Sequence, residues 1–92
     1  MDAQTRIERL DALVEAEVGG ELVGLDIERG SCFAFNPTAT RIWQMIEEPC
    51  TLNALCDRLM AEHDVDRPTC LADTAAVLAD LAAERLIVLT AP

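Results

Sequence analysis

The periodicity of the sequence changes at Asn36-Pro37. Before this point apolar and polar residues alternate, as Val14, Ala16 and Val18 do with the glutamates between them, and a period of two predicts β-strands. Beyond it apolar residues recur every three or four positions, which predicts amphipathic helices. A run of strands followed by a run of helices indicates an α+β domain and argues against alternating βαβ units.

The first part of the chain predicts a meander. Its strands are expected at residues 13–18, 23–27 and 31–35. Gly19-Gly20 supplies a two-residue hairpin turn between the first two strands, and Glu28-Arg29-Gly30 offers a turn before the third. The secondary structure of residues 1–12 stays undecided. Ile7, Leu10 and Val14 fit a helical period, whereas Ile7, Arg9 and Asp11 do not establish the alternation of a strand.

The second part predicts three helices. Asn36 is a good N-cap, Pro37 is favoured at the first helical position, and Pro49 closes this helix. Thr51 caps the second helix, and Pro68 opens a third that ends near Leu86, followed by a short extended tail. We therefore expect a winged-helix-like α+β fold, in which a three-stranded antiparallel meander precedes three helices and the last two form a helix-turn-helix.

Size and charge exclude several classes of function. The 92 residues suffice for one domain, which we place at residues 1–92. The net charge of −10 argues against binding nucleic acids or anionic membranes. Neither a membrane span nor a signal peptide is visible, so we expect a cytoplasmic protein. In that compartment its four cysteines are expected to be free thiols: Cys32, Cys50, Cys56 and Cys70.

The sequence offers no apparatus for catalysis by this chain alone. His63 is a lone histidine among carboxylates on a polar segment, which is typical of a solvated loop and not of a zinc site. Glycine-rich phosphate loops and local signatures of a cysteine nucleophile are missing. We expect no enzyme, no metal and no cofactor, and we assign Trp43 to the core because it shares a helical face with Ile42 and Ile46.

The predicted third strand is unusual for an edge strand. Natural proteins protect sheet edges with charge, proline or cover, but Ser31, Cys32, Phe33, Ala34 and Phe35 include neither charge nor proline. Such an edge is a candidate for strand addition by an extended peptide. Equally well, a terminal segment of the chain, residues 1–12 or 87–91, could cover it. The same edge could also mediate a homodimer.

The predicted last helix has a second, mixed stripe beside its apolar one. The stripe consists of Asp73, Val77, Asp80 and Glu84, with Ala76 and Leu81 beside it. Acids interleaved with apolar residues would accept both basic and apolar side chains of a peptide. A plain solvated helix face is the alternative.

Several short motifs, in this order along the chain, resemble the PqqD family over residues 14–89. They are Leu22-Val23-Gly24-Leu25-Asp26, Glu28-Arg29-Gly30, Phe33-Ala34-Phe35-Asn36-Pro37-Thr38-Ala39, Arg41-Ile42-Trp43, Asp64-Val65, and Leu78-x-x-Leu81 to Arg85-Leu86-Ile87. The Asn-Pro-Thr run with Ile42-Trp43 resembles the stand-alone members of lasso-peptide pathways more than the pyrroloquinoline-quinone members, although Phe35 stands where the family usually has leucine.

This resemblance implies a winged-helix recognition element for ribosomally synthesised, post-translationally modified peptides. Its members bind a precursor's leader as an added strand and present the precursor to a leader peptidase, a cyclase or a radical-SAM protein, without a cofactor. By resemblance the docking strand is Cys32–Phe35, and the groove wall is Asp73, Ala76, Val77, Asp80, Leu81 and Glu84. The competing hypotheses are a winged-helix transcription regulator, which needs a basic recognition helix, and a non-catalytic subunit of an enzyme complex.

Overall fold

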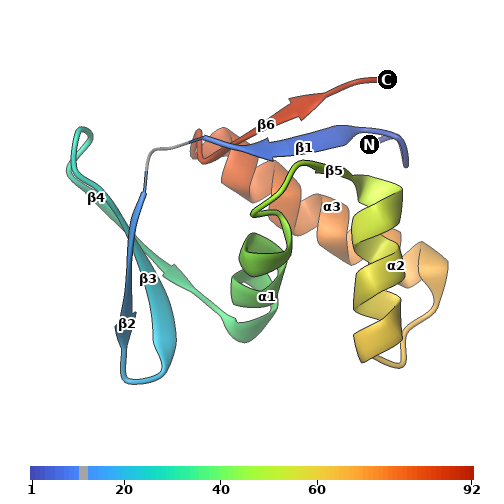
Figure 1. The fold of residues 1–92 in the computed structure, drawn as a ribbon, viewed down its shortest axis with the longest axis horizontal. Coiled ribbons are helices and arrows are strands. Elements are labelled where there is room, and N and C mark those ends of the chain that lie inside the picture. The colour runs from blue at the N-terminus through green and yellow to red at the C-terminus, as the bar shows by residue number, and fades with distance from the viewer. Residues whose placement is uncertain (11–12) are drawn as a thin grey trace.

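The computed structural model describes residues 1–10 and 13–92. These residues form two antiparallel sheets and three helices, and Figure 1 shows how they are arranged. The larger sheet has the order β2-β3-β4 and consists of β2 (Val14–Val18), β3 (Glu21–Asp26) and β4 (Ser31–Phe35). The helices are α1 (Pro37–Met45), α2 (Leu52–Glu62) and α3 (Arg67–Ala83). The smaller sheet has the order β5-β1-β6 and consists of β1 (Arg6–Arg9), β5 (Cys50–Thr51) and β6 (Ile87–Thr90). The predicted α+β meander with three following helices is confirmed.

The turn between β2 and β3 fixes the hydrogen-bonding phase of the larger sheet. Gly19 and Gly20 have φ angles of 61° and 83°, the pair of positive values that a type I′ turn requires. Such a two-residue turn is closed by a hydrogen-bonded pair, here Val18 and Glu21. Because bonded and non-bonded pairs alternate along an antiparallel ladder, Val23 directs its backbone N–H and C=O toward β2.

Side-chain caps begin all three helices. Asn36 and Thr51 accept hydrogen bonds from the backbone N–H groups of Ala39 and Ala54, at 2.8 and 3.1 Å, as the sequence predicted. The third helix begins at Arg67, capped by Asp66, so Pro68 lies in its first turn. It ends at Ala83, three residues before the predicted end, because the chain turns at Glu84 and Arg85 to enter β6.

The smaller sheet joins the two ends of the chain and was not predicted. Residues Arg6–Arg9 form a strand between β5 and β6, in which Ile7 is fully buried. The segment that the sequence left undecided is therefore a strand at Arg6–Arg9, while Asp11 and Ala12 lie outside the described residues. Within the described residues the two terminal segments pair with each other and not with β4, so the alternative that one of them covers the β4 edge is wrong for these residues.

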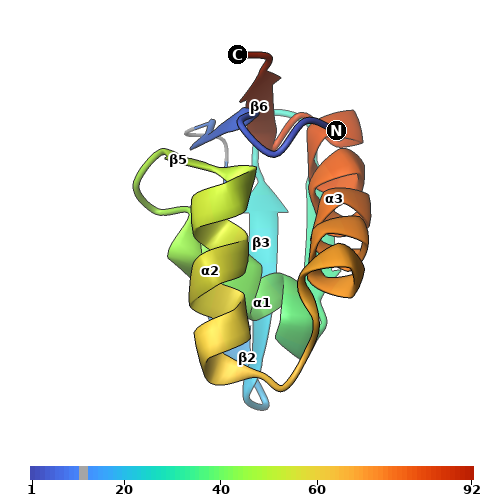
Figure 2. The same ribbon diagram turned by 90° about the vertical axis from the view of Figure 1, so that its right-hand side faces the viewer.

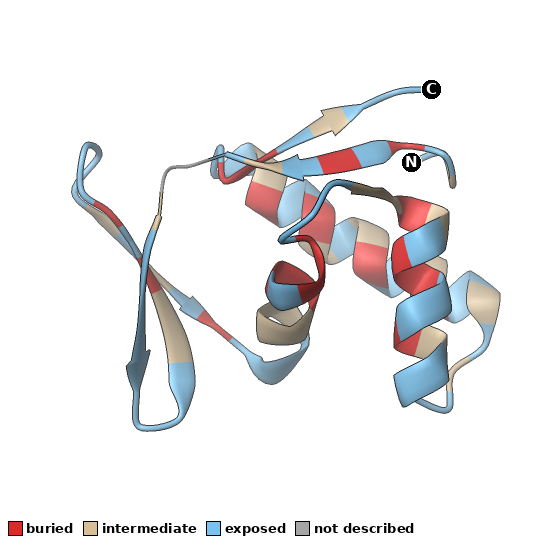
Figure 3. Cartoon of the chain, viewed as in Figure 1, coloured by how far each residue is buried: buried red, intermediate tan, exposed pale blue. Residues whose placement is uncertain are grey.

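The core lies between the smaller sheet, the helices and one face of the larger sheet (Figure 3). Trp43 is 2% exposed, which confirms its predicted place, and its ring meets Phe35 edge to face with 5.6 Å between centroids. The face of the larger sheet that contacts the core carries Phe35 and Leu22, which are paired across β4 and β3. One face of the larger sheet therefore packs against the core, and its other face is exposed to solvent.

The solvent face of the larger sheet is apolar. Val14, Val18 and Leu25 are 51%, 64% and 39% exposed, and Ile27 in the turn after β3 is 75% exposed. The alternation in β2 predicted its two faces correctly. However, it is Glu15 that lies on the face toward the helices, while Val14 and Val18 lie on the face toward solvent.

Candidate functional site

The outer edge of β4 exposes unpaired backbone groups. Ala34 lies opposite Val23 and Cys32 lies opposite Leu25 in the β3–β4 register. Since Val23 and Leu25 direct their backbone groups toward β2, the N–H and C=O groups of Cys32 and Ala34 point away from β3. No strand of the described chain pairs with this side of β4. The edge therefore offers two donors and two acceptors to an incoming strand.

Helix α3 lies on the same side of the molecule as β4, as Figures 1 and 2 show together. The C-terminal end of α3 is held by Arg29 in the β3–β4 turn. The Arg29 guanidinium donates to the backbone carbonyl of Glu84 and lies 3.8 Å from the Glu84 carboxylate. Arg29 also lies 3.8 Å from the carboxylate of Asp26, a residue only 5% exposed. This contact fixes the turn against the end of α3.

At the other end, Pro37 lies two residues beyond the end of β4 and lines the same cavity as Asp73 near the start of α3. From Asp73 to Glu84 the helix rises by about 17 Å, and a five-residue strand such as β4 also spans about 17 Å. We call the edge of β4 at Cys32 and Ala34, together with the exposed residues of α3 between Asp73 and Glu84, the β4–α3 face.

The sequence-predicted site residues occupy different positions on this face. In β4, Cys32 and Ala34 are exposed on the solvent face of the sheet, Ser31 and Phe33 are half-buried, and Phe35 is buried. On α3, Asp73, Ala76, Asp80 and Glu84 are exposed and Val77 is half-buried. Leu81 is 8% exposed and belongs to the core, so it supports the face from below and offers little surface.

A cavity of about 410 Å³ opens at the Asp73 end of this face, where α1 begins, α2 ends and α3 begins. Its walls include Ile42, Leu59 and Cys70, which are 1%, 6% and 5% exposed. Sequence reasoning missed this cavity, because its residues come from three helices whose packing no local pattern specifies.

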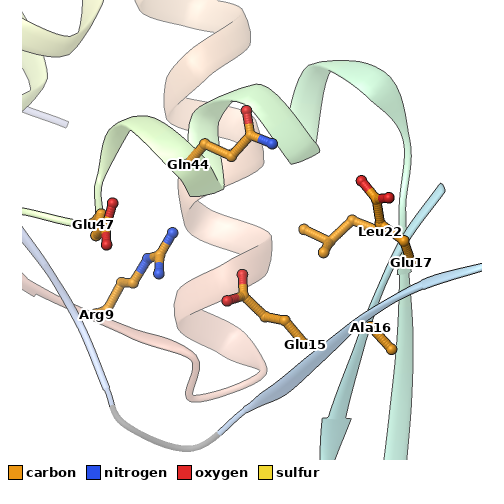
Figure 4. Close-up of a pocket in the computed structure, with 7 residues that line it drawn as sticks. All are labelled: Arg9, Glu15, Ala16, Glu17, Leu22, Gln44 and Glu47. Carbon is orange, nitrogen blue, oxygen red and sulfur yellow. The ribbon is translucent and has the colours of Figure 1, made fainter. Parts of the chain in front are cut away.

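A second cavity, of about 330 Å³, lies at the β2 edge of the larger sheet, between β2, β1 and α1 (Figure 4). Figure 4 shows Arg9 between Glu15 and Glu47. The Arg9 guanidinium stacks on the ring of Trp43 at 4.2 Å and donates to the Trp43 carbonyl, while the Trp43 indole N–H donates to Glu15 at 2.5 Å.

These contacts give the second cavity a structural role. Burial lowers the pKa of the Arg9 guanidinium, and the carboxylates of Glu15 and Glu47 oppose that shift. The charges thus compensate one another while they tie β1, β2 and α1 around Trp43. The sequence held no signal for this cluster, because Arg9 and Glu15 both follow patterns of solvent-exposed residues.

The cysteines are free thiols in the structure. Cys56 is fully buried, and burial raises the pKa of its thiol to about 11, so the thiol stays protonated near neutral pH. Residues 1–10 and 13–92 contain no group of three or more His, Cys, Asp or Glu side chains arranged to hold a metal ion. Within the same part of the chain, no helix has both the length and the apolar character needed to cross a membrane.

Comparison with protein-family models identifies one family. Residues 21–87 match the family model of PqqD, coenzyme PQQ synthesis protein D. Among curated proteins none matches the chain. The solved structure of TbiB1 in complex with the TbiA(beta) leader peptide is similar, with a TM-score of 0.78 and 34% identity over 87% of this chain and 93% of that one.

A second solved structure supports the fold. Lasso peptide synthetase B1 complexed with the leader peptide has a TM-score of 0.71 and 22% identity, over 89% of this chain and 96% of that one. Both structures therefore share the arrangement of sheets and helices described above across nearly their whole length. The family model, the 34% identity to TbiB1 and the shared fold lead to one conclusion: this chain belongs to the PqqD family.

Proposed function

We propose that this chain binds the leader segment of a ribosomally synthesised precursor peptide as an added strand on β4, and presents the precursor to a modifying enzyme. The observation that carries the proposal is the free, uncharged outer edge of β4 in a member of the PqqD family. The complex of TbiB1 with a leader peptide supports it, because TbiB1 is 34% identical to this chain.

Backbone pairing gives such a complex part of its affinity. The donors and acceptors of Cys32 and Ala34 allow four hydrogen bonds, each with a net contribution of about 0.5–1.5 kcal/mol, or about 2–6 kcal/mol together. A Kd of about 1 μM corresponds to about −8 kcal/mol, after the entropic cost of association. Strand addition alone therefore falls short, and side-chain contacts with α3 must supply the rest.

The exposed part of α3 suits a peptide with both basic and apolar side chains. Asp73, Asp80 and Glu84 present carboxylates along it, with Ala76 and Val77 between them. Opposite charge at a solvent-exposed surface contributes mainly to association rate and register, while apolar contacts contribute affinity. The chain's net charge of −10 favours the approach of a basic segment over the whole surface.

Presentation to an enzyme follows from the geometry of an added strand. Alternate side chains of a strand paired with β4 would extend the solvent face of the sheet, which is already apolar at Leu25 and Ile27. A leader peptidase, a cyclase or a radical-SAM protein are the classes of enzyme that such a complex would serve. The part of the precursor outside the added strand would extend away from the β4–α3 face, where such an enzyme could reach it.

An NMR titration of ¹⁵N-labelled protein tests the proposal. The probes are the synthetic TbiA(beta) leader and a leader from the small precursor gene nearest to the gene of this chain. We expect saturable shifts at residues 31–36 and 73–84, with protection of the Cys32 and Ala34 amides from solvent exchange. Saturable binding without shifts in β4 would contradict strand addition, and the absence of binding to both probes at millimolar concentration would contradict leader recognition.

A further inference from the structure

Helix α3 ends in a backbone conformation that arginine rarely adopts. The backbone N–H of Leu86 donates to the carbonyl of Leu81 at 3.0 Å, and the N–H of Arg85 also donates back into the last turn. These two bonds form a Schellman motif, in which the residue after the helix cap has a positive φ and is usually glycine. Here that residue is Arg85, with a φ of 59°, and no other non-glycine residue of the described chain has a positive φ. Arg85 therefore holds backbone strain at the end of α3.

Interactions inside the molecule do not account for an arginine at this position. A cation near a helix C-terminus interacts favourably with the helix dipole, but an arginine in place of exposed Ala83 would bring the same charge in an unstrained helical conformation. Arg85 itself is exposed, and within the described residues it forms no ion pair. A ligand outside the molecule would supply the missing reason for a charged side chain here.

The other arginines show how unusual this position is. The chain has seven arginines and no lysine, and four of the seven donate to groups inside the molecule: Arg9, Arg41, Arg58 and Arg67. Arg6 lies on β1 in the smaller sheet, which leaves Arg29 and Arg85. Arg29 is 40% exposed and lies 3.8 Å from each of its two carboxylates, a long distance for an ion pair. The β4–α3 face is therefore acidic at Asp73 and Asp80 and carries loosely compensated cations at its other end.

A strand added to β4 leaves the face at this cationic end. All neighbours in the larger sheet are antiparallel, and a peptide that continues this pattern runs from the Phe35 end of β4 to the Ser31 end. Arg29 lies two residues before Ser31 and donates to the carbonyl of Glu84, the residue next to Arg85. At about 3.4 Å per residue, the peptide therefore passes the end of α3 about two to four residues after its paired segment.

We infer that Arg85 binds a carboxylate side chain of the precursor peptide, carried about two to four residues after the segment that pairs with β4. The inference rests on the proposed function, since it assumes an antiparallel strand added to β4. It adds a determinant of direction. Backbone pairing accepts either direction of an extended segment, whereas a cation at one end of the face favours the direction that brings a carboxylate to it. The nearby Arg29 adds to the positive potential at the same end.

A charge scan of the peptide tests the inference. The probe is the synthetic leader that binds in the NMR titration, and a series with one N-methylated backbone amide at each position locates the paired segment by its loss of affinity. A second series carries one glutamate or one lysine at each position, with affinities measured by fluorescence anisotropy. About two to four residues after the paired segment, we expect glutamate to bind about fivefold more tightly than lysine, a modest preference because the pair is exposed. A preference for glutamate only before the paired segment, or nowhere, would overturn the inference.

Substitution of Arg85 assigns the preference to this residue. Arg85→Gly removes the charge and relieves the positive φ, so the protein should melt no earlier than wild type while the fivefold preference for glutamate falls to about one. Arg85→Asn, which also tolerates a positive φ, should behave in the same way, and Arg85→Lys should retain part of the preference. Arg6→Ala removes an exposed arginine from β1 and is the matched control, with the preference unchanged. A purely structural role of Arg85 would alter melting and leave the preference for glutamate as it is.

The outcomes separate the inference from the proposed function. A fivefold preference that persists in both Arg85→Gly and Arg85→Asn would show that another group binds the carboxylate, while leader binding by strand addition would stand. Equal affinities of the glutamate and lysine peptides for wild-type protein would have the same meaning. If no leader binds wild-type protein, the proposed function fails first and the role of Arg85 fails with it.

Discussion

The two edges of the larger sheet differ in how they meet an approaching strand. At β2 the residues whose backbone groups point outward are Glu15 and Glu17, and the carboxylate of Glu15 is held by the indole of Trp43. At β4 the corresponding residues are Cys32 and Ala34, which bring neither charge nor bulk. Within one sheet, therefore, one edge is protected by acidic residues and anchored to the core, and the other is left open.

Proline at the open edge should have the largest effect. Ala34→Pro removes an outward N–H and places a ring where the added strand would lie, without removing a bond between β3 and β4. We expect leader affinity to fall about 30-fold or more, equivalent to about 2 kcal/mol. Isothermal titration measures this, and thermal melting checks that the fold is kept.

The matched control lies at the protected edge. Glu17→Pro removes an outward N–H from β2, at an exposed position of the same sheet. Leader affinity should remain within twofold of wild type. Equal losses of affinity in both proline variants would mean that the sheet as a whole, and not the β4 edge, determines binding.

Removal of the Glu15 anchor should affect stability and not binding. Glu15→Ala deletes the acceptor of the Trp43 indole N–H and leaves that donor without a partner inside the molecule. We expect the free energy of unfolding to fall by about 1–2 kcal/mol, measured by urea denaturation, with unchanged leader affinity. Glu17→Ala, which removes a neighbouring exposed carboxylate, should change stability by less than about 0.5 kcal/mol. A fall in leader affinity in Glu15→Ala would show that the two edges are coupled.

The contact between the β3–β4 turn and α3 should matter for binding more than for stability. Arg29→Ala removes the donor to the Glu84 carbonyl and the cation near buried Asp26. We expect about fivefold weaker leader binding, because the β4 edge and α3 lose their fixed spacing. Arg6→Ala, an exposed arginine of β1, is the control for loss of one positive charge. If both variants bind the leader with the affinity of wild type, the contact between Arg29 and α3 plays no part in binding.

Charge reversal on α3 should have the smallest effect. Asp80→Arg places a cation on the exposed side of the β4–α3 face, so binding of a leader with a lysine or arginine near it should weaken about threefold. Asp64→Arg, an exposed acid in the connecting segment, gives the same change of net charge away from the face. The difference between the two should shrink with added salt, and an equal or tighter affinity for Asp80→Arg would exclude an electrostatic role.

Local patterns in the sequence predicted most of the larger sheet and the helices. The glycine pair between β2 and β3 specifies its turn through φ, and Asn36 and Thr51 specify helix starts through their side-chain caps. The uncharged β4 edge was recognisable for the same reason, since it depends on the composition of five adjacent residues. The mixed stripe of α3 was predicted as a surface, but Leu81 beside it proved to be core.

The sequence by itself determined where the three helices and the strands of the larger sheet lie, which residues share a face, and that β4 lacks the usual protection of an edge. Only the tertiary structure decided that the terminal strands β1 and β6 pair with each other, that Arg9 and Glu15 contact Trp43, and that a cavity opens where α1 begins, α2 ends and α3 begins. The reason is physical. Caps, turns and periodicity act between residues a few positions apart, whereas pairing of residues 6–9 with 87–90 and the meeting of three helix ends depend on how the whole chain buries its apolar surface.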